Sequence, residues 1–126
     1  MGELYTKQEG SVSYDNLFAG INVDVTHKGV NLQSGQGLVR RGTVLGIITA
    51  SGLAVRVDST KVDGSQTANC ILADDTDTTA GNVVAVAYTS GLFNRQALVF
   101  GGTDTATQHE NTLRDVGIFL KDNIPY

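Results

Sequence analysis

The two histidines are the first side chains to consider for acid–base chemistry in this sequence. His27 and His109 both lie in polar surroundings, one in a turn-like stretch and one near a predicted helix start. A hydrolytic site needs such a base beside a nucleophile and oriented by a carboxylate. No G-x-S-x-G segment is present to hold a nucleophilic serine on a strand-to-helix turn. We therefore predict that both histidines are solvated surface residues and that the protein is not an enzyme.

A short acidic stretch offers the best candidate for a metal site. Asp74, Asp75 and Asp77 lie close together, and carboxylates at such spacing can bind Ca²⁺ or Mg²⁺. An EF-hand loop that began at Asp74 would need glycine at its sixth position and glutamate at its twelfth, but Thr79 and Ala85 stand there. Because aspartate often serves turns, we predict a solvated loop, with no metal site and no cofactor. A small divalent-cation-binding module stays open as an alternative.

The glycine-rich segment and the cysteine predict no further chemistry. Gly35 and Gly37 are not followed by the third glycine of a dinucleotide-binding fingerprint, and no Gly-Lys-Ser or Gly-Lys-Thr sequence forms a P-loop. Cys70 is the only cysteine, so no intrachain disulfide can form. It lies in the apolar stretch ANCILA, where we expect a small core hydrophobe in a protein made in a reducing cytoplasm.

The composition predicts one small, β-rich domain. Among 126 residues there are 15 glycines and one proline, which indicates many turns and short strands. The net charge of −4 argues against a nucleic-acid partner, and the chain has no apolar run of about 18 residues that would predict a membrane span. We therefore expect a compact α+β domain, mainly β, with one or two short helices.

Short apolar patterns predict the strands of this domain. Alternating or continuous apolar runs predict strands at 21–26, 44–48, 53–57, 68–73 and 83–88. The second and third of these flank Ser51-Gly52 and predict a hairpin, in which Gly46 indicates a bulge or a close backbone approach. Residues 26–29 predict a turn.

Two helical segments are expected after the last of these strands. Asn94 precedes a short helical turn and is a suitable N-cap. A second helix is predicted from about residue 107 or 108 to Leu120, because Leu113, Val116, Gly117 and Leu120 would share one face.

The first 16 residues differ from the rest of the chain. They are polar and lack a sustained period, with scattered Leu4, Tyr5, Val12 and Tyr14. Such a segment buries too little apolar surface to offset the entropy cost of ordering it. We predict a mobile N-terminal arm over residues 1–16 and a folded domain over residues 17–126, with Val12 and Tyr14 able to form a strand on another sheet edge.

Five blocks of sequence carry a family resemblance when they are taken in order. They are LFAG (17–20), SGQGLVRRGTVLGIITASG (34–52), DGSQTANCILADDTD (63–77), VVAVAYTSGLFNRQAL (83–98) and TLRDVGIFL (112–120). Together they resemble the lambda-type head decoration proteins of tailed phages over residues 17–120. The chain departs from the expected pattern at Ile47, where relatives often carry a polar residue, and in the tail KDNIPY.

The resemblance implies a structural, capsid-cementing protein of the virion. Such proteins sit as homotrimers on the outside of the head at local three-fold positions and stabilise the shell. Their N-terminal segment orders against the major capsid protein, which here implies capsid contacts by Leu4, Tyr5, Val12 and Tyr14. A carbohydrate-binding module on the virion surface is a further alternative.

The basic pair at Arg40 and Arg41 has a predicted place in such an assembly. Planar guanidinium groups can pair with phosphate or carboxylate. On an edge strand they also deter unwanted pairing and meet acidic neighbours. We expect both arginines to lie at the edge of the 38–52 hairpin, available to an acidic partner on a neighbouring subunit.

Overall fold

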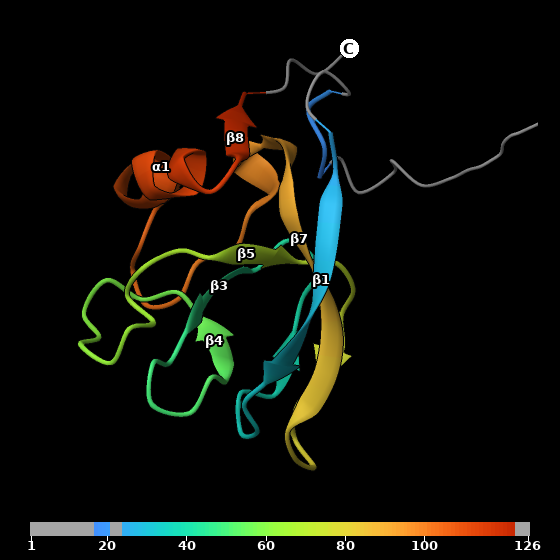
Figure 1. Cartoon of the computed structure of the whole chain (residues 1–126), viewed down its shortest axis with the longest axis vertical. Helices are drawn as coiled ribbons and strands as arrows, with labels where there is room; N and C mark the ends of the chain where they lie inside the picture. Colours follow the sequence, from blue (N-terminus) through green and yellow to red (C-terminus); the bar gives the residue numbers. More distant parts are fainter. Residues whose placement is uncertain (1–16, 21–23, 123–126) are drawn as a thin grey trace, which may run out of the picture.

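A small closed β-barrel forms the body of the protein. The structure is a computed structural model that describes residues 17–20 and 24–122. Along the chain the elements are β1 (Thr26–Leu32), β2 (Leu38–Val39), β3 (Val44–Ile47), β4 (Ala54–Arg56), β5 (Cys70–Leu72), β6 (Thr76–Asp77), β7 (Val83–Asn94), the 3₁₀ helix η2 (Arg95–Ala97), α1 (Ala106–Asp115) and β8 (Ile118–Lys121). These bear out the prediction of a compact, mainly β domain with little helix (Figure 1).

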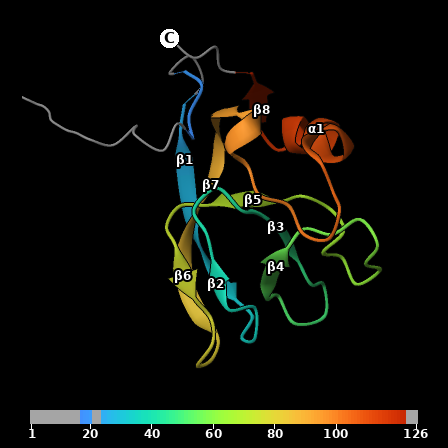
Figure 2. The ribbon, with the colours of Figure 1, turned by 180° about the vertical axis from the view of Figure 1, so that it is seen from behind.

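The barrel closes because β7 is long enough to pair with three other strands. The sheet order is β1-β4-β3-β5-β7-β8, and β1 also pairs with β7, so five strands form a ring. Over Val83–Ser90, β7 runs antiparallel to β1, while its last four residues run parallel to β8. Ring closure pairs most of the strand edges that would otherwise be open to other chains. A separate pair, β2 and β6, lies beside the barrel (Figure 2).

Alternation along the strands divides the apolar residues between two cores. One face of each strand fills the barrel, where Leu45, Cys70 and Leu72 are fully buried. The opposite faces of β3 and β5 carry Val44 and Ile71 into a second core outside the barrel wall. That second core also holds Leu17, Phe93, Leu113 and Ile118, so α1, β8 and the first described residues cover one side of the barrel.

The N-cap and the hairpin between the second and third predicted strands are confirmed, but the hairpin does not include residues 38–41: Leu38–Val39 pair with β6, and Arg40 and Arg41 lie between β2 and β3, not at the hairpin edge. β3 and β4 pair antiparallel, and the chain turns between them at Gly52, whose φ of 74° favours glycine. A side chain at Gly46 would overlap the backbone of Ser65, which is the close approach that the sequence indicated. Asn94 caps η2 by accepting a hydrogen bond from the backbone N–H of Gln96 at 3.2 Å.

The predicted second helix is too long at its C-terminal end. α1 ends at Asp115, and Gly117 has a φ of 95°, a left-handed conformation that interrupts the helix. Residues 118–120, which the predicted helix included, instead belong to β8, which pairs with Gly91–Asn94. The pattern was ambiguous because Ile118 and Leu120 also alternate as a strand requires, and pairing with β7 decides between the two.

The turn predicted at residues 26–29 is also wrong. Thr26–Gly29 belong to β1, where His27 pairs with Tyr88 and Gly29 with Val86. Their ladder partner lies about sixty residues away in the sequence, so no local pattern could indicate it. The predicted strand at 21–26 falls partly on residues 21–23, which lie outside the described residues.

Candidate functional site

The first described residues are built into the sheet at one end of the molecule. The backbone N–H of Ala19 donates to the carbonyl of Leu92 at 2.9 Å, and that of Asn94 donates to the carbonyl of Leu17 at 2.7 Å. Leu17 is buried, and β8, which ends at Lys121 and pairs with Asn94, lies at the same end (Figure 1, Figure 2). Leu17 and Asp122, the first and the last residue that the structure describes, therefore lie at one end of the body.

Phe18 fixes this root to the barrel through aromatic contacts. Its ring stacks on Phe93 with centroids 4.9 Å apart and meets Tyr88 edge-on at 5.0 Å. Such aromatic pairs stabilise by about 0.5–1.5 kcal/mol beyond the area they bury. The root of the N-terminal segment is consequently held rigidly.

Arg41 completes this cluster from the turn between β2 and β3. Its Nη1 donates to the carbonyl of Ala73 at 2.6 Å and to the hydroxyl of Tyr88 at 2.9 Å. Its guanidinium carbon lies 5.6 Å from the centroid of the Tyr88 ring and 6.0 Å from that of Phe18, within cation–π range. The side chain of Arg41 is therefore engaged within its own domain, an arrangement that the sequence did not indicate.

Arg40 has a different environment from its neighbour. It is exposed, and its side chain makes no hydrogen bond or ion pair with any of the residues described. A shallow hollow brings it together with Arg41, Asp74 and Asp75. Of the two arginines predicted at a subunit contact, Arg40 is thus the one with an uncommitted charge.

Two of the three aspartates of the acidic stretch accept hydrogen bonds within the loop region. Asp75 accepts a hydrogen bond from the backbone N–H of Arg41 at 2.6 Å. Asp77 accepts from the N–H and hydroxyl of Thr79, and these two hydrogen bonds lower the pKa of Asp77. Within residues 17–20 and 24–122, no group of three potential metal ligands comes together. The carboxylates shape the loop, as aspartates in turns commonly do.

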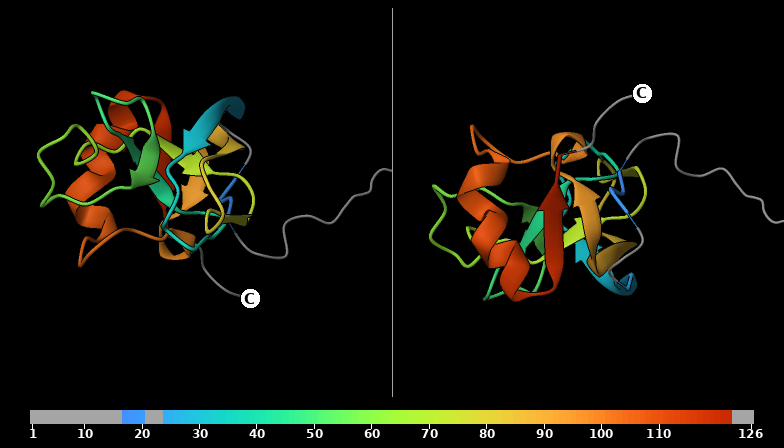
Figure 3. Two further views of the ribbon diagram at one scale, coloured as in Figure 1. Left: turned by 90° about the horizontal axis from the view of Figure 1, so that it is seen from below. Right: turned by 90° about the horizontal axis from the view of Figure 1, so that it is seen from above.

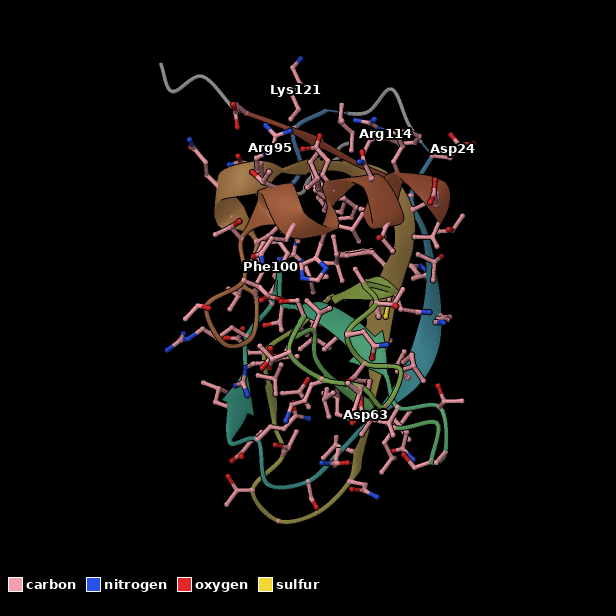
Figure 4. All side chains as sticks on the ribbon, turned by 90° about the vertical axis from the view of Figure 1, so that its left-hand side faces the viewer. Asp24, Asp63, Arg95, Phe100, Arg114 and Lys121 are labelled. Carbon is pink, nitrogen blue, oxygen red and sulfur yellow. The ribbon has the colours of Figure 1, made fainter. Side chains whose placement is uncertain are left out.

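His109 is buried, which contradicts the prediction of a solvated surface residue. It is 3% exposed, it stacks on Phe100, and its Nε2 lies 2.6 Å from Oδ2 of Asp104 (Figure 4). Asp104 also accepts from the N–H and hydroxyl of Ser59. The sequence missed this because both partners of His109, Phe100 and Asp104, come from a glycine-containing loop, and Asp104 is held in turn by Ser59, which is distant in the chain. His27, by contrast, is exposed as predicted.

This network does not have the geometry of a hydrolytic triad. The hydroxyl of Ser59 is bonded to Asp104 and not to His109, so the imidazole is not placed to take its proton. Cys70 is equally unsuited to chemistry, because burial in the barrel raises the pKa of its thiol to about 11. The hydrogen-bonded network around Asp104 and the buried Cys70 therefore stabilise the fold.

Two ion pairs of Arg95 connect α1 to the last described residue, Asp122. Arg95 donates to Glu110 of α1 at 2.7 Å and to Asp122 at 2.9 Å (Figure 4). Hydrogen bonds to these two carboxylates raise the pKa of Arg95. None of the helices in the described part of the chain is long and apolar enough to cross a membrane.

A comparison with known protein families shows the family of this chain. The family model described as bacteriophage lambda head decoration protein D matches residues 6–118. The chain belongs to the phage head decoration protein family. A search of curated proteins found no significant match.

Members of this family are structural proteins of phage heads, so the chain is a capsid decoration protein and a component of the virion. The match includes eleven residues before the root at Leu17, so the family model continues into the N-terminal segment. The predicted capsid contacts of the decoration protein, Leu4, Tyr5, Val12 and Tyr14, lie outside the described residues. Their role stays a prediction.

Proposed function

We propose that this decoration protein binds the outer surface of the phage head as a homotrimer at three-fold positions, and that it stabilises the shell. Residues 1–16 are the segment that reaches the major capsid protein. The observation that carries the proposal is the family match, which extends to residue 6; the hydrogen bonds of Leu17 and Ala19 to β7 support it, because they fasten the start of the folded body to the sheet.

Strand addition is the binding mode that suits a closed barrel with a separate binding segment. The barrel pairs its own strands around a ring, while a short segment with alternating Val12 and Tyr14 can add a strand to another sheet. Main-chain hydrogen bonds then provide affinity with modest demands on sequence. The body needs no reactive group for this role; it has to present its arms in a fixed geometry.

Three arms on one trimer explain how a weak contact could cement a shell. One arm has to be ordered before it binds, which reduces its affinity. After the first arm docks, the second and third docking events are intramolecular and occur at high effective concentration. A ligand that binds only the mature shell stabilises it by about 2.7 kcal/mol when its free concentration is a hundred times Kd.

The proposal is tested with emptied, undecorated shells of the phage that this protein decorates. The full-length protein should sediment with the shells. Decorated shells should dissociate at a higher temperature than undecorated shells and should resist a higher concentration of chelator. A variant that lacks residues 2–16 should keep the melting temperature of the full chain and should fail to sediment with shells. Undiminished binding by that variant would exclude the arm, and unchanged shell stability with the full-length protein would exclude cementing.

Two alternatives have their own readouts in the same experiment. A carbohydrate-binding module would bind a glycan array whether or not residues 2–16 are present. A divalent-cation-binding module would show a melting temperature that rises with the concentration of Ca²⁺ or Mg²⁺. We do not expect a response to cations, because the carboxylates of Asp75 and Asp77 already accept hydrogen bonds within the loop region.

A further inference from the structure

One side of strand β1 carries backbone groups that no part of the described chain pairs. The backbone N–H of Gln33 donates to the carbonyl of Ala54 at 3.0 Å, so this side of β1 faces β4. In a strand the N–H and C=O groups of alternate residues point to the same side, which places those of His27 and Gly29 there as well. β4 pairs with β1 only at Leu32, and no group in the described part of the chain hydrogen-bonds to these backbone groups of His27 and Gly29. We call these groups the β1 edge.

The β1 edge is accessible as well as unpaired. Residues 26–29 are all exposed, so this half of β1 is not covered by the rest of the described chain. Lysine often guards an exposed strand edge, but Nζ of Lys28 donates to Oδ1 of Asn69 at 3.1 Å and is held beside the start of β5. α1 and β1 lie on opposite sides of the barrel, so the helix does not cover the edge either (Figure 3). An unpaired, accessible edge is a template for one further strand.

The outward face next to this edge is apolar and has space for a large side chain. Val86 lies opposite Gly29 and Val84 lies opposite Asn31, and directly opposite residues share a face. Val84 is 77% exposed and Val86 is 47% exposed. A side chain at Gly29 would meet no atom within 4 Å, and Gly29 is not among the glycines with positive φ, so the fold does not require glycine there. Glycine within a strand marks a close approach of another chain, and an aromatic side chain on the next strand can cover it.

The β1 edge continues the line along which the N-terminal segment enters the body. Phe18 forms an antiparallel bridge with Phe93, and Thr26 pairs antiparallel with Ser90, so both follow β7 in the same direction. Residues 17–20 lie directly above β1 in two opposite views (Figure 1, Figure 2). At this end β8 occupies the other side of β7. A shell strand that pairs with the N-terminal segment can therefore continue along the same side of the sheet to the β1 edge.

We propose that an extended segment of the major capsid protein adds as a strand to the β1 edge. The proposal rests on the proposed function, in which the N-terminal segment binds this capsid protein. The free N–H and C=O groups of His27 and Gly29 bond to the backbone of the added strand, and a large apolar side chain of that strand lies across Gly29 against Val86. The body of the decoration protein then contributes binding surface of its own.

A second copy of the chain suits this edge less well than the capsid protein does. Two β1 edges that paired with each other would be related by a two-fold axis, whereas the proposed trimer has a three-fold axis. Each copy has one N-terminal segment and one β1 edge on the same side of β7. One capsid segment for each copy therefore satisfies both.

Proline and alanine at position 29 form a matched pair of variants. The space above Gly29 is open, so both side chains have room. G29P removes the N–H that belongs to the β1 edge, and proline is tolerated on an edge strand where the N–H is outside the ladder. G29A keeps this N–H. Sedimentation with undecorated shells over a range of protein concentrations should give an affinity about tenfold lower for G29P than for the wild type, and G29A should stay within about threefold. Melting curves check that each variant is folded.

Hydrogen exchange on the wild-type chain tests the edge without any substitution, so it also covers the case in which G29P does not fold. The protein is exchanged in D₂O either free or on shells, and mass spectrometry after acid dissociation measures the deuterium in each fragment. The amides of His27 and Gly29 should exchange at least about tenfold more slowly on shells than in the free protein, because they become hydrogen-bonded. The amide of Val62, a residue that is 94% exposed in another loop, is the control and should exchange equally in both states.

The outcomes distinguish this inference from the proposed function. When the wild type binds shells, unprotected amides at His27 and Gly29, or a G29P variant that binds as tightly as G29A, would overturn the inference and leave the proposed function intact. Shell binding without residues 2–16 but with protected amides would support the inference and exclude the arm. Wild-type protein that does not bind shells overturns both.

Two further results would assign the β1 edge to a different occupant and so overturn the inference. Protection of the same amides in trimers without shells would mean that a second copy covers the edge. Protection in the free full-length protein that is lost when residues 2–16 are deleted would mean that the N-terminal segment of the chain itself covers it.

Discussion

At the scale of single residues, the basic pair at positions 40 and 41 shows how two identical side chains take different roles. Arg41 reaches back onto Tyr88 and Phe18 and donates to the carbonyl of Ala73, whereas Arg40 is exposed. The sequence indicates only that both arginines lie next to a predicted strand. It could not show which one meets the aromatic rings, because those rings come from segments far away in the chain.

Replacement of Arg41 should therefore destabilise the protein more than replacement of Arg40. R41A removes two hydrogen bonds from a charged donor and two cation–π contacts, and we expect a loss of about 2 kcal/mol. For a domain of this size that corresponds to a fall in melting temperature of about 8 °C. R40A should stay within about 0.5 kcal/mol of the wild type. Thermal unfolding followed by circular dichroism measures both, and equal effects would contradict the assigned contacts.

The buried pair of His109 and Asp104 predicts how stability changes in acid. Burial alone would raise the pKa of Asp104, but hydrogen bonds from His109 and Ser59 outweigh it and lower the pKa below the ordinary value of about 4. A carboxyl group whose pKa is lower in the folded state adds stability above the unfolded pKa and loses it as the pH falls through the folded pKa. The stabilisation should thus be present near neutral pH and should be lost as the pH falls below about 4.

Comparison with the D104N variant isolates this effect. An amide does not titrate, so the difference in unfolding free energy between the wild type and D104N should be largest near pH 7 and should shrink as the pH falls below about 4. Urea unfolding at a series of pH values measures it. A difference that stays constant with pH would show that the carboxylate does not contribute through its ionised form.

At the scale of secondary-structure elements, the junction of α1 and β8 depends on one glycine. Gly117 has a φ of 95°, and a side chain there meets only ordinary contacts, so the cost of substitution comes from the backbone conformation. We expect G117A to destabilise the protein by about 1–2 kcal/mol. G29A, in a strand with open space above it, should be neutral or slightly stabilising. Chemical denaturation measures both variants, and an unaffected G117A would contradict the assigned conformation.

The same elements show what local sequence can and cannot predict. The hairpin of β3 and β4 and the cap at Asn94 depend on residues only a few positions apart, so their patterns were sufficient. The strand assignment of residues 26–29 and of 118–121 depends on β7, which is distant from β1 and needs the whole ring to be in place. The candidate site follows the same rule: Arg40, Arg41 and the acidic stretch were visible in the sequence, but the contacts of Arg41 with Phe18 and Tyr88 required the folded barrel.

At the scale of the whole molecule, the proposed function makes the closed barrel a carrier for the N-terminal segment. If the protein binds as a trimer, binding to the shell should depend on the number of arms in each trimer and not only on their concentration. The body would then fix where the three roots lie. Trimers that contain both full-length and truncated chains should therefore bind shells less well than their content of full-length chain alone would give.

Trimers refolded from equal amounts of full-length chain and a chain lacking residues 2–16 provide this test. If chains combine at random, about one trimer in eight carries three arms, and trimers with fewer arms lose intramolecular docking events. The fraction that sediments with shells should therefore fall well below one half, while the same two proteins refolded separately and then mixed should give one half. Shell binding in simple proportion to the content of full-length chain would mean that each arm acts alone, and the trimer would then serve a purpose other than avidity.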